Sequence, residues 1–115
     1  MKYINFDRSV EKIPANKVQN YLGSGTHLVG GAEVSYAKVV EVFGKPGTET
    51  DGYKVDAEWQ VLTPEGVATI YNYKDGKNYN GDDGLETKEI TDWHIGGHTE
   101  LVVHYVRKAL GLEDE

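Results

Sequence analysis

The chain contains no cysteine. This absence excludes a disulfide framework, a catalytic thiolate and zinc sites with cysteine ligands, and it fits the reducing environment of a cytoplasm. The sequence also lacks any apolar run long enough to span a membrane, and its first residues, MKYINFDRSVEKIPANK, lack the apolar centre of a signal peptide. We therefore expect a cytoplasmic protein with no membrane partner.

Positive charge is scarce as well. The sequence has 12 lysine and arginine residues against 19 aspartate and glutamate residues, which gives a formal net charge of −7. Since nucleic-acid binding depends on a basic surface that releases counterions, we expect no nucleic-acid partner. The acidic residues are scattered along the chain, which favours a role in solubility. The alternative is that they mimic DNA and occupy a DNA-binding protein.

Length and composition predict one domain over residues 1–115, because a hydrophobic fraction of 38% is sufficient for one modest core. Proline, asparagine and glycine interrupt residues 1–25, so this segment is expected to be irregular. Residues 111–115 are expected to form a frayed tail. Eight tyrosines against two phenylalanines are the unusual feature of the composition, since tyrosine suits interfaces and ligand pockets.

Two helices are predicted from apolar periodicity and end signals. The first covers residues 35–43, where apolar side chains follow the i, i+3, i+4, i+7 spacing of one buried stripe. Ser35 is its expected N-cap, and Gly44 and Pro46 end it. The second covers TELVVHYVRKALG, residues 99–111, with a glycine at its end.

Three segments between these helices have the pattern of strands. YKVDAEWQVLT alternates apolar and polar residues, TPEG is typical of a β-turn, and VATIYNYK completes an antiparallel hairpin. EITDWHI is the third strand, and the polar, glycine-rich residues 75–88 before it are predicted to form a long loop that is functional or mobile.

These elements predict an α+β fold: a small antiparallel sheet of three to four strands, flanked by two helices on one face. The fourth strand would come from the segment near GTHLV or from a second copy of the chain. Because so small a sheet leaves its edges exposed, we expect a homo-oligomer.

The first candidate site is WHIGGHTE, predicted to join a strand to the second helix. A helix N-terminus exposes unpaired N–H groups and a partial positive charge, and both favour an anion. In this hypothesis the backbone N–H groups of Gly96, Gly97 and His98 hold phosphate. The alternative is a structural turn in which the two glycines permit positive φ.

The remaining side chains of this stretch would complete a nucleotide site. Trp93 would stack on a base, His94 would supply charge or a hydrogen bond, and Thr99 would add a hydroxyl. In the alternative, Trp93 belongs to the core and His98 or Thr99 caps the helix.

The second candidate site is ATIYNYKDGKNYNG. The stretch combines stacking surfaces, an amide and positive charge, which suits a nucleotide. These features come from Tyr71, Tyr73, Tyr79, Asn72, Lys74 and Lys77. The alternative is a strand with cross-strand aromatic pairs and an exposed loop, and we favour it for Tyr71 alone. Tyr73 and Lys74 stay open between the two interpretations.

Catalytic and metal-binding patterns are scarce. The sequence has no G-x-S-x-G motif, no P-loop and no H-E-x-x-H pair, so no catalytic residue, no metal and no cofactor is predicted. His94 and His98 are four residues apart, but the glycines between them disfavour the helix that would bring both to a shared metal. A small phosphoesterase with one of these histidines as its general base is the less favoured alternative.

The order of FGKP, AEW, ATIYNYK and WHIGG, over roughly residues 24–98, resembles a family of small proteins encoded by bacteriophages, most of them without an assigned function. The resemblance implies a phage origin and action in the cytoplasm of an infected bacterium. By analogy with small, oligomeric phage sponges that sequester cyclic nucleotide or ADP-ribose signals, we expect an anti-defence protein that binds a nucleotide-derived immune signal without catalysis. The alternative is an inhibitor whose acidic surface binds a host defence protein.

Overall fold

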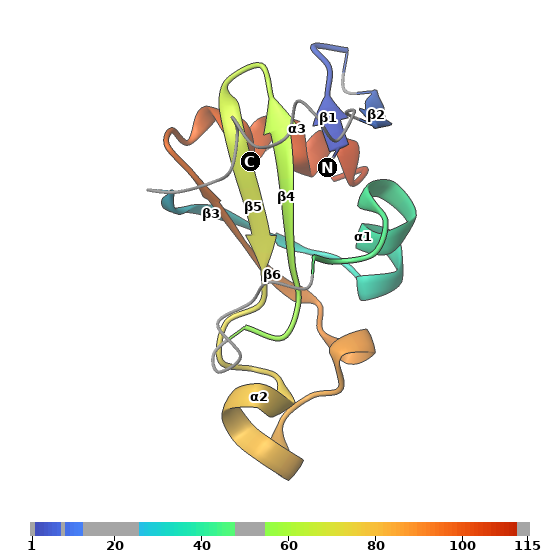
Figure 1. Ribbon diagram of the computed structural model, residues 1–115, viewed down its shortest axis with the longest axis vertical. Helices are drawn as coiled ribbons and strands as arrows, with labels where there is room; N and C mark the ends of the chain where they lie inside the picture. Colours follow the sequence, from blue (N-terminus) through green and yellow to red (C-terminus); the bar gives the residue numbers. More distant parts are fainter. Residues whose placement is uncertain (1, 8, 13–25, 48–54, 113–115) are drawn as a thin grey trace.

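The computed structural model describes residues 2–7, 9–12, 26–47 and 55–112. These residues form a six-stranded sheet with helices packed against it and a segment of short helices beyond its end (Figure 1). In chain order the elements are β1 (Lys2–Ile4), β2 (Val10–Lys12), β3 (His27–Glu33), α1 (Tyr36–Phe43), β4 (Glu58–Thr63), β5 (Gly66–Tyr71), α2 (Lys77–Asn80), the 3-10 helices η3 (Gly81–Asp83) and η4 (Thr87–Glu89), β6 (Asp92–Gly97) and α3 (Leu101–Ala109).

The strand order across the sheet is β2-β1-β4-β5-β6-β3. All neighbouring pairs are antiparallel except β1 and β4, which are parallel. The predicted α+β class is confirmed, but the predicted antiparallel sheet of three to four strands is wrong. The sheet is mixed and has six strands.

The two N-terminal strands explain most of this error. β1 and β2 each span three residues, too few to show an alternating pattern, and they lie in the segment predicted to be irregular. β1 finds its partner far along the chain, because Lys2 lies opposite Val61 and Tyr3 opposite Leu62. A pairing between residues so distant in sequence leaves no local signal. Residues 13–25 of the predicted irregular segment lie outside the described residues.

The first helix and the hairpin follow the prediction closely. The Ser35 hydroxyl accepts a hydrogen bond from the Lys38 N–H at 3.1 Å, and Gly44 ends α1 with a φ of 84°. β4 and β5 pair in register from Glu58 opposite Tyr71 to Thr63 opposite Gly66. Alternate residues of the 55–61 segment are buried, as its sequence pattern predicts.

Two tryptophans of the sheet form hydrogen bonds at the two ends of α1. The indole N–H of Trp93, in β6, donates to the carbonyl of Val34 at 2.9 Å, just before the helix begins. The indole N–H of Trp59, in β4, donates to the carbonyl of Gly44 at 2.8 Å, where the helix ends. The two indole rings contact each other edge to face at 5.2 Å. Both rings are buried, so they combine core packing with two directed hydrogen bonds.

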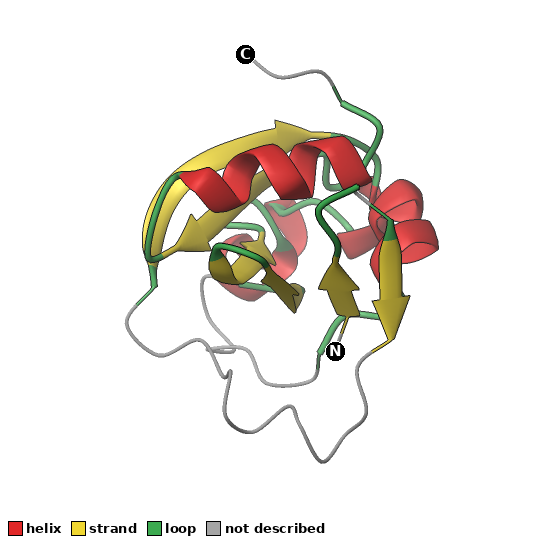
Figure 2. Cartoon of the chain, turned by 90° about the horizontal axis from the view of Figure 1, so that it is seen from above, coloured by secondary structure: helices red, strands yellow, loops and turns green. Residues whose placement is uncertain are grey.

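The helix α3 lies across the curved sheet (Figure 2) and shares one core with α1. Val102, Tyr105 and Val106 form its buried face, as its apolar stripe predicts. Each buried side chain of this size contributes about 1.5–3 kcal/mol to stability. Leu112 also packs against this core and donates its N–H to the Arg107 carbonyl at 2.9 Å, so the predicted frayed tail does not begin at residue 111. Residues 113–115 lie outside the described residues.

Glycines in β3 and β6 allow α3 to approach the sheet closely. A Cβ atom added at Gly97 would lie 2.6 Å from Cγ2 of Val102, and one added at Gly30 would lie 2.7 Å from Cγ2 of Val103. Both distances are shorter than any ordinary carbon–carbon contact. The glycines are therefore required by the packing of α3 on two adjacent strands.

We expect Gly97→Ala to destabilise the protein by about 1–3 kcal/mol, because Val102 must move to admit the new methyl group. Gly47→Ala is the matched control, since its Cβ would meet the Glu58 carbonyl at an ordinary 3.5 Å. Both substitutions restrict the unfolded chain equally, so the difference between their urea midpoints reports the packing. Equal midpoints for the two variants would contradict the close approach of α3.

Candidate functional site

The glycines of WHIGGHTE lie inside a central strand. β6 continues through both residues, with Gly96 opposite Thr69 and Leu28, and Gly97 opposite Ala68 and His27. α3 begins only at Leu101. The expected phosphate seat on the N–H groups of Gly96 and Gly97 at a helix N-terminus therefore needs correction, because these groups belong to a strand with neighbours on both sides.

His98 and Thr99 form the short connection between β6 and α3. His98 is exposed, and the Thr99 hydroxyl accepts the N–H of Leu101 at 3.3 Å. The N-cap of α3 is Glu100, so Thr99 lies one residue before the cap position given to it in the structural alternative. The Thr99 hydroxyl is bonded to the first residue of α3.

Trp93 and His94 lie on opposite faces of the sheet, because side chains alternate along a strand. Trp93 is 0% exposed and belongs to the core, so its expected role as a stacking surface for a base is also corrected. His94 points away from the core and lies directly opposite Tyr71 of β5. Of the predicted residues, His94 is thus the one that β6 brings to the second candidate site.

Tyr71, Tyr73, Lys74, Tyr79 and His94 come together in the structure, and we call them the aromatic cluster. The Tyr73 and His94 rings stack at 5.6 Å with an interplanar angle of 30°, and the Tyr71 ring meets His94 edge-on at 5.5 Å. The Lys74 ammonium lies 5.2 Å from the centre of the Tyr73 ring and 5.3 Å from that of Tyr79. Tyr73 is 41% exposed and Tyr79 is 38% exposed, so a ligand can reach both rings.

The segment that presents this cluster is folded around a buried amide. Residues 72–91, which we call the lobe, extend beyond the end of the sheet (Figure 1). The Asn72 side chain is 0% exposed; its oxygen accepts the N–H groups of Asp56 and Ala57 at 2.7 and 3.0 Å. Its nitrogen donates to the carboxylates of Asp56 and Asp75 at 3.0 and 2.9 Å. Both acceptor and both donor positions of the amide are used.

Further contacts give the lobe a fixed path. The Asp56 carboxylate also accepts the N–H of Asn78 at 3.1 Å. It lies so close to Gly76 that a Cβ atom there would collide with it. The segment predicted to be a long loop instead contains α2, η3 and η4, and its shape follows from these hydrogen bonds.

Lys74 has an unusual backbone conformation. Its φ of 63° is the one positive φ of a non-glycine residue in the described part of the chain. A lysine in the left-handed region costs roughly 1–2 kcal/mol relative to the right-handed one. The Asn80 amide donates to the Lys74 carbonyl at 2.8 Å and holds this conformation in place. A strained residue that carries an exposed charge is a reason to suspect function.

The surroundings of Tyr71 change the pKa of its phenol. Burial of its phenol, the nearby carboxylate of Glu58 and the Tyr73 hydroxyl, in that order, raise the pKa of Tyr71. Tyr71 therefore stays a neutral hydrogen-bonding phenol over the physiological pH range.

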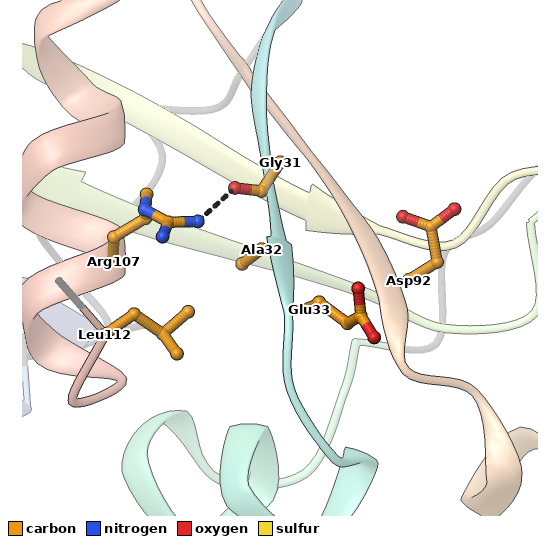
Figure 3. A pocket seen from close by; sticks show the side chains of 6 residues that line it. All are labelled: Gly31, Ala32, Glu33, Asp92, Arg107 and Leu112. Carbon is orange, nitrogen blue, oxygen red and sulfur yellow. Dashed lines mark hydrogen bonds between the residues drawn. The ribbon is translucent and has the colours of Figure 1, made fainter. Parts of the chain in front are cut away.

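A separate open pocket of about 320 Å³ lies beside β3 (Figure 3). The Arg107 guanidinium donates to the carbonyl of Gly31 at 2.9 Å on one side of the strand, and the carboxylates of Glu33 and Asp92 lie on the other. Ala32 and Leu112 complete its lining. Two carboxylates opposite each other in the β3–β6 register make this pocket a poor seat for phosphate. None of the residues predicted from sequence lines it.

Within residues 2–7, 9–12, 26–47 and 55–112, no three His, Cys, Asp or Glu side chains gather where they could hold a metal ion. No helix in the same residues combines the length and apolar character that crossing a membrane requires.

We expect the raised pKa of Tyr71 to appear as one tyrosine that ionises at unusually high pH. The folded protein keeps this proton above the ordinary tyrosine pKa of about 10. The stability linked to it is therefore complete below that pH and is lost as the pH rises through the folded-state pKa. An ultraviolet titration of phenolate should lose its latest component in Tyr71→Phe. Persistence of that component in the variant would assign it to another tyrosine.

Comparison with known proteins adds no residue role to this geometry. No family model matches the sequence, and no match is found among curated proteins or among solved structures. The roles of the cluster residues are therefore argued from their contacts, exposure and charge.

Proposed function

We propose that the protein binds a small ligand that has a planar ring and an anionic group, as a nucleotide has, and that it holds this ligand without converting it. The observation that carries the proposal is the aromatic cluster, where two half-exposed tyrosine rings lie beside the Lys74 ammonium. Aromatic stacking accepts any base, and an ammonium binds phosphate as a point charge.

The charge distribution supports Lys74 as the anchor for the anion. Of the two cations at the start of the lobe, Lys77 pairs with Glu86 at 3.3 Å. The carboxylates of Asp56 and Asp75 accept hydrogen bonds from Asn72. Lys74 contacts tyrosine rings and has no carboxylate partner among the described residues. Its charge is therefore available to a ligand in a protein that is otherwise acidic.

The absence of a recognisable catalytic motif in the sequence favours binding over turnover. Together with the resemblance to small phage proteins, the cluster supports a more specific proposal: the protein sequesters a nucleotide-derived immune signal in an infected bacterium. His94 contributes to this site by stacking on Tyr73, which fixes the ring against which the base would lie.

We expect Tyr73→Ala to weaken nucleotide binding by about tenfold or more, because stacking contributes about 1–3 kcal/mol per base. Isothermal calorimetry with a panel of cyclic nucleotides and ADP-ribose derivatives would first identify the ligand. Phe6→Ala is the matched control, since Phe6 is the most exposed large hydrophobic residue described and lies outside the cluster. No binding across the panel, or equal weakening by both substitutions, would refute the proposal.

A protein partner is the second candidate function. Leu85 is 43% exposed in the lobe, with the exposed carboxylates of Asp82, Asp83 and Glu86 around it in sequence. An apolar side chain within an acidic surface suits a basic partner surface. This candidate predicts that a complex captured from host lysate weakens with salt and is lost in Asp82→Asn/Asp83→Asn, whereas Tyr73→Ala leaves it intact. A complex insensitive to both salt and the double substitution would exclude this surface.

A further inference from the structure

We propose that the Lys74 ammonium fills the ligand seat in the free protein and makes the site selective for ligands with an anionic group next to the ring. The inference rests on the proposed function and adds a rule for which ligands are accepted. In this arrangement Lys74 lies against Tyr73 and Tyr79 until a ligand ring replaces it. The ammonium then moves to the anionic group of that ligand.

The position of the ammonium is the first support. It lies 5.2 and 5.3 Å from the centres of two tyrosine rings, within the range of cation–π attraction to each. A ring that stacks on the exposed face of Tyr73 or Tyr79 must compete with this ammonium for the same surface. The free site is therefore already occupied by part of the protein.

The second support is that the backbone of Lys74 stays in place while its side chain can move. Asn80 holds the Lys74 carbonyl at 2.8 Å, and Asn72 and Asp75 on either side are joined by a hydrogen bond of 2.9 Å. The four-carbon stem of lysine is flexible. Displacement of the ammonium therefore needs only side-chain rotation, with no change in the path of the lobe.

Selectivity follows from what the displaced ammonium gains. A neutral ligand removes the cation–π contacts of Lys74 and offers no charge in return. A ligand with phosphate replaces them with a charge-assisted hydrogen bond, which is stronger. A nucleoside should therefore bind less well than the corresponding nucleotide, by about tenfold or more.

Lys74→Gly is the sharpest test of this role. Glycine adopts a φ of 63° without strain, so the backbone keeps its path and the melting temperature should not fall. We expect calorimetry to show that the wild type prefers AMP to adenosine by about tenfold or more, and that in Lys74→Gly this ratio falls to about one, as adenosine gains and AMP loses affinity. Lys108→Ala, at an exposed lysine of α3, should keep the wild-type ratio.

A second measurement tests, without any ligand, whether the Lys74 ammonium lies against the Tyr73 and Tyr79 rings. In the free protein, the two tyrosine rings should shift the NMR signals of the Lys74 Cε protons upfield relative to those of Lys108. Tyr79→Leu should reduce this shift, and AMP should abolish it. Normal Lys74 signals in the free protein would overturn the inference.

The outcomes separate this inference from the proposed function. Suppose that AMP binds and that Tyr73→Ala weakens its binding, but that Lys74→Gly keeps the preference for AMP over adenosine. The proposed binding site would then be supported and the role of Lys74 would be refuted. If neither AMP nor any other nucleotide binds, the proposed function and the selectivity fall together. An upfield shift of the Lys74 signals would then remain only as a structural contact.

Discussion

The structure depends most on the two indole hydrogen bonds that hold α1 against the sheet. Trp93 and Trp59 reach the carbonyls at either end of the helix, and their rings meet in the centre of the core. This arrangement fixes the face of β6 that points inward. Because residues alternate along a strand, a buried Trp93 places His94 on the opposite face, beside Tyr71 and Tyr73. The requirements of the core therefore determine where the aromatic cluster lies.

The lobe shows how an acidic segment presents a cation. Three of its carboxylates bond to an amide, a backbone N–H and a second lysine, and none of them forms an ion pair with Lys74 among the described residues. The same hydrogen bonds fix the backbone that carries Tyr73, Lys74 and Tyr79. The net negative charge of the chain argues against a nucleic acid, which needs many cations, but it is compatible with one small anion held by a single ammonium and by ring stacking.

Local patterns allowed the local elements to be predicted. The Ser35 N-cap and the terminating Gly44 predict the bounds of α1, and the alternation of apolar and polar residues around Trp59 predicts the first strand of the β4–β5 hairpin. The pairings of β1 with β4 and of β3 with β6 join residues distant in sequence and could not be predicted. The glycines of WHIGG illustrate the same limit. A glycine pair favours a turn in the sequence, but here Gly97 makes room for Val102 of α3 and Gly96 lies against the Thr69 side chain on the other face of the sheet.

The candidate site was predicted in part. Tyr73 and Lys74 were left open from sequence, and the structure brings them together with His94. Tyr79 was named as a stacking surface but was not chosen as a ligand-binding residue, since its contact with Lys74 depends on the fold of α2 and on the Asn80 hydrogen bond to the Lys74 carbonyl. Asn72 was expected to offer its amide to a nucleotide, but the amide is buried and bonded within the protein, and sequence alone did not indicate this burial.

The parallel pairing of β1 with β4 has a consequence for synthesis. A ribosome makes the N-terminal strand first, but the central strand that holds it appears only after residue 58 has been added. β3 pairs with β6, which is synthesised later than β4. The nascent chain must therefore carry the β1–β2 pair without the rest of the sheet until β4 emerges, and β3 without its partner until β6 emerges. Only then can the sheet close cooperatively.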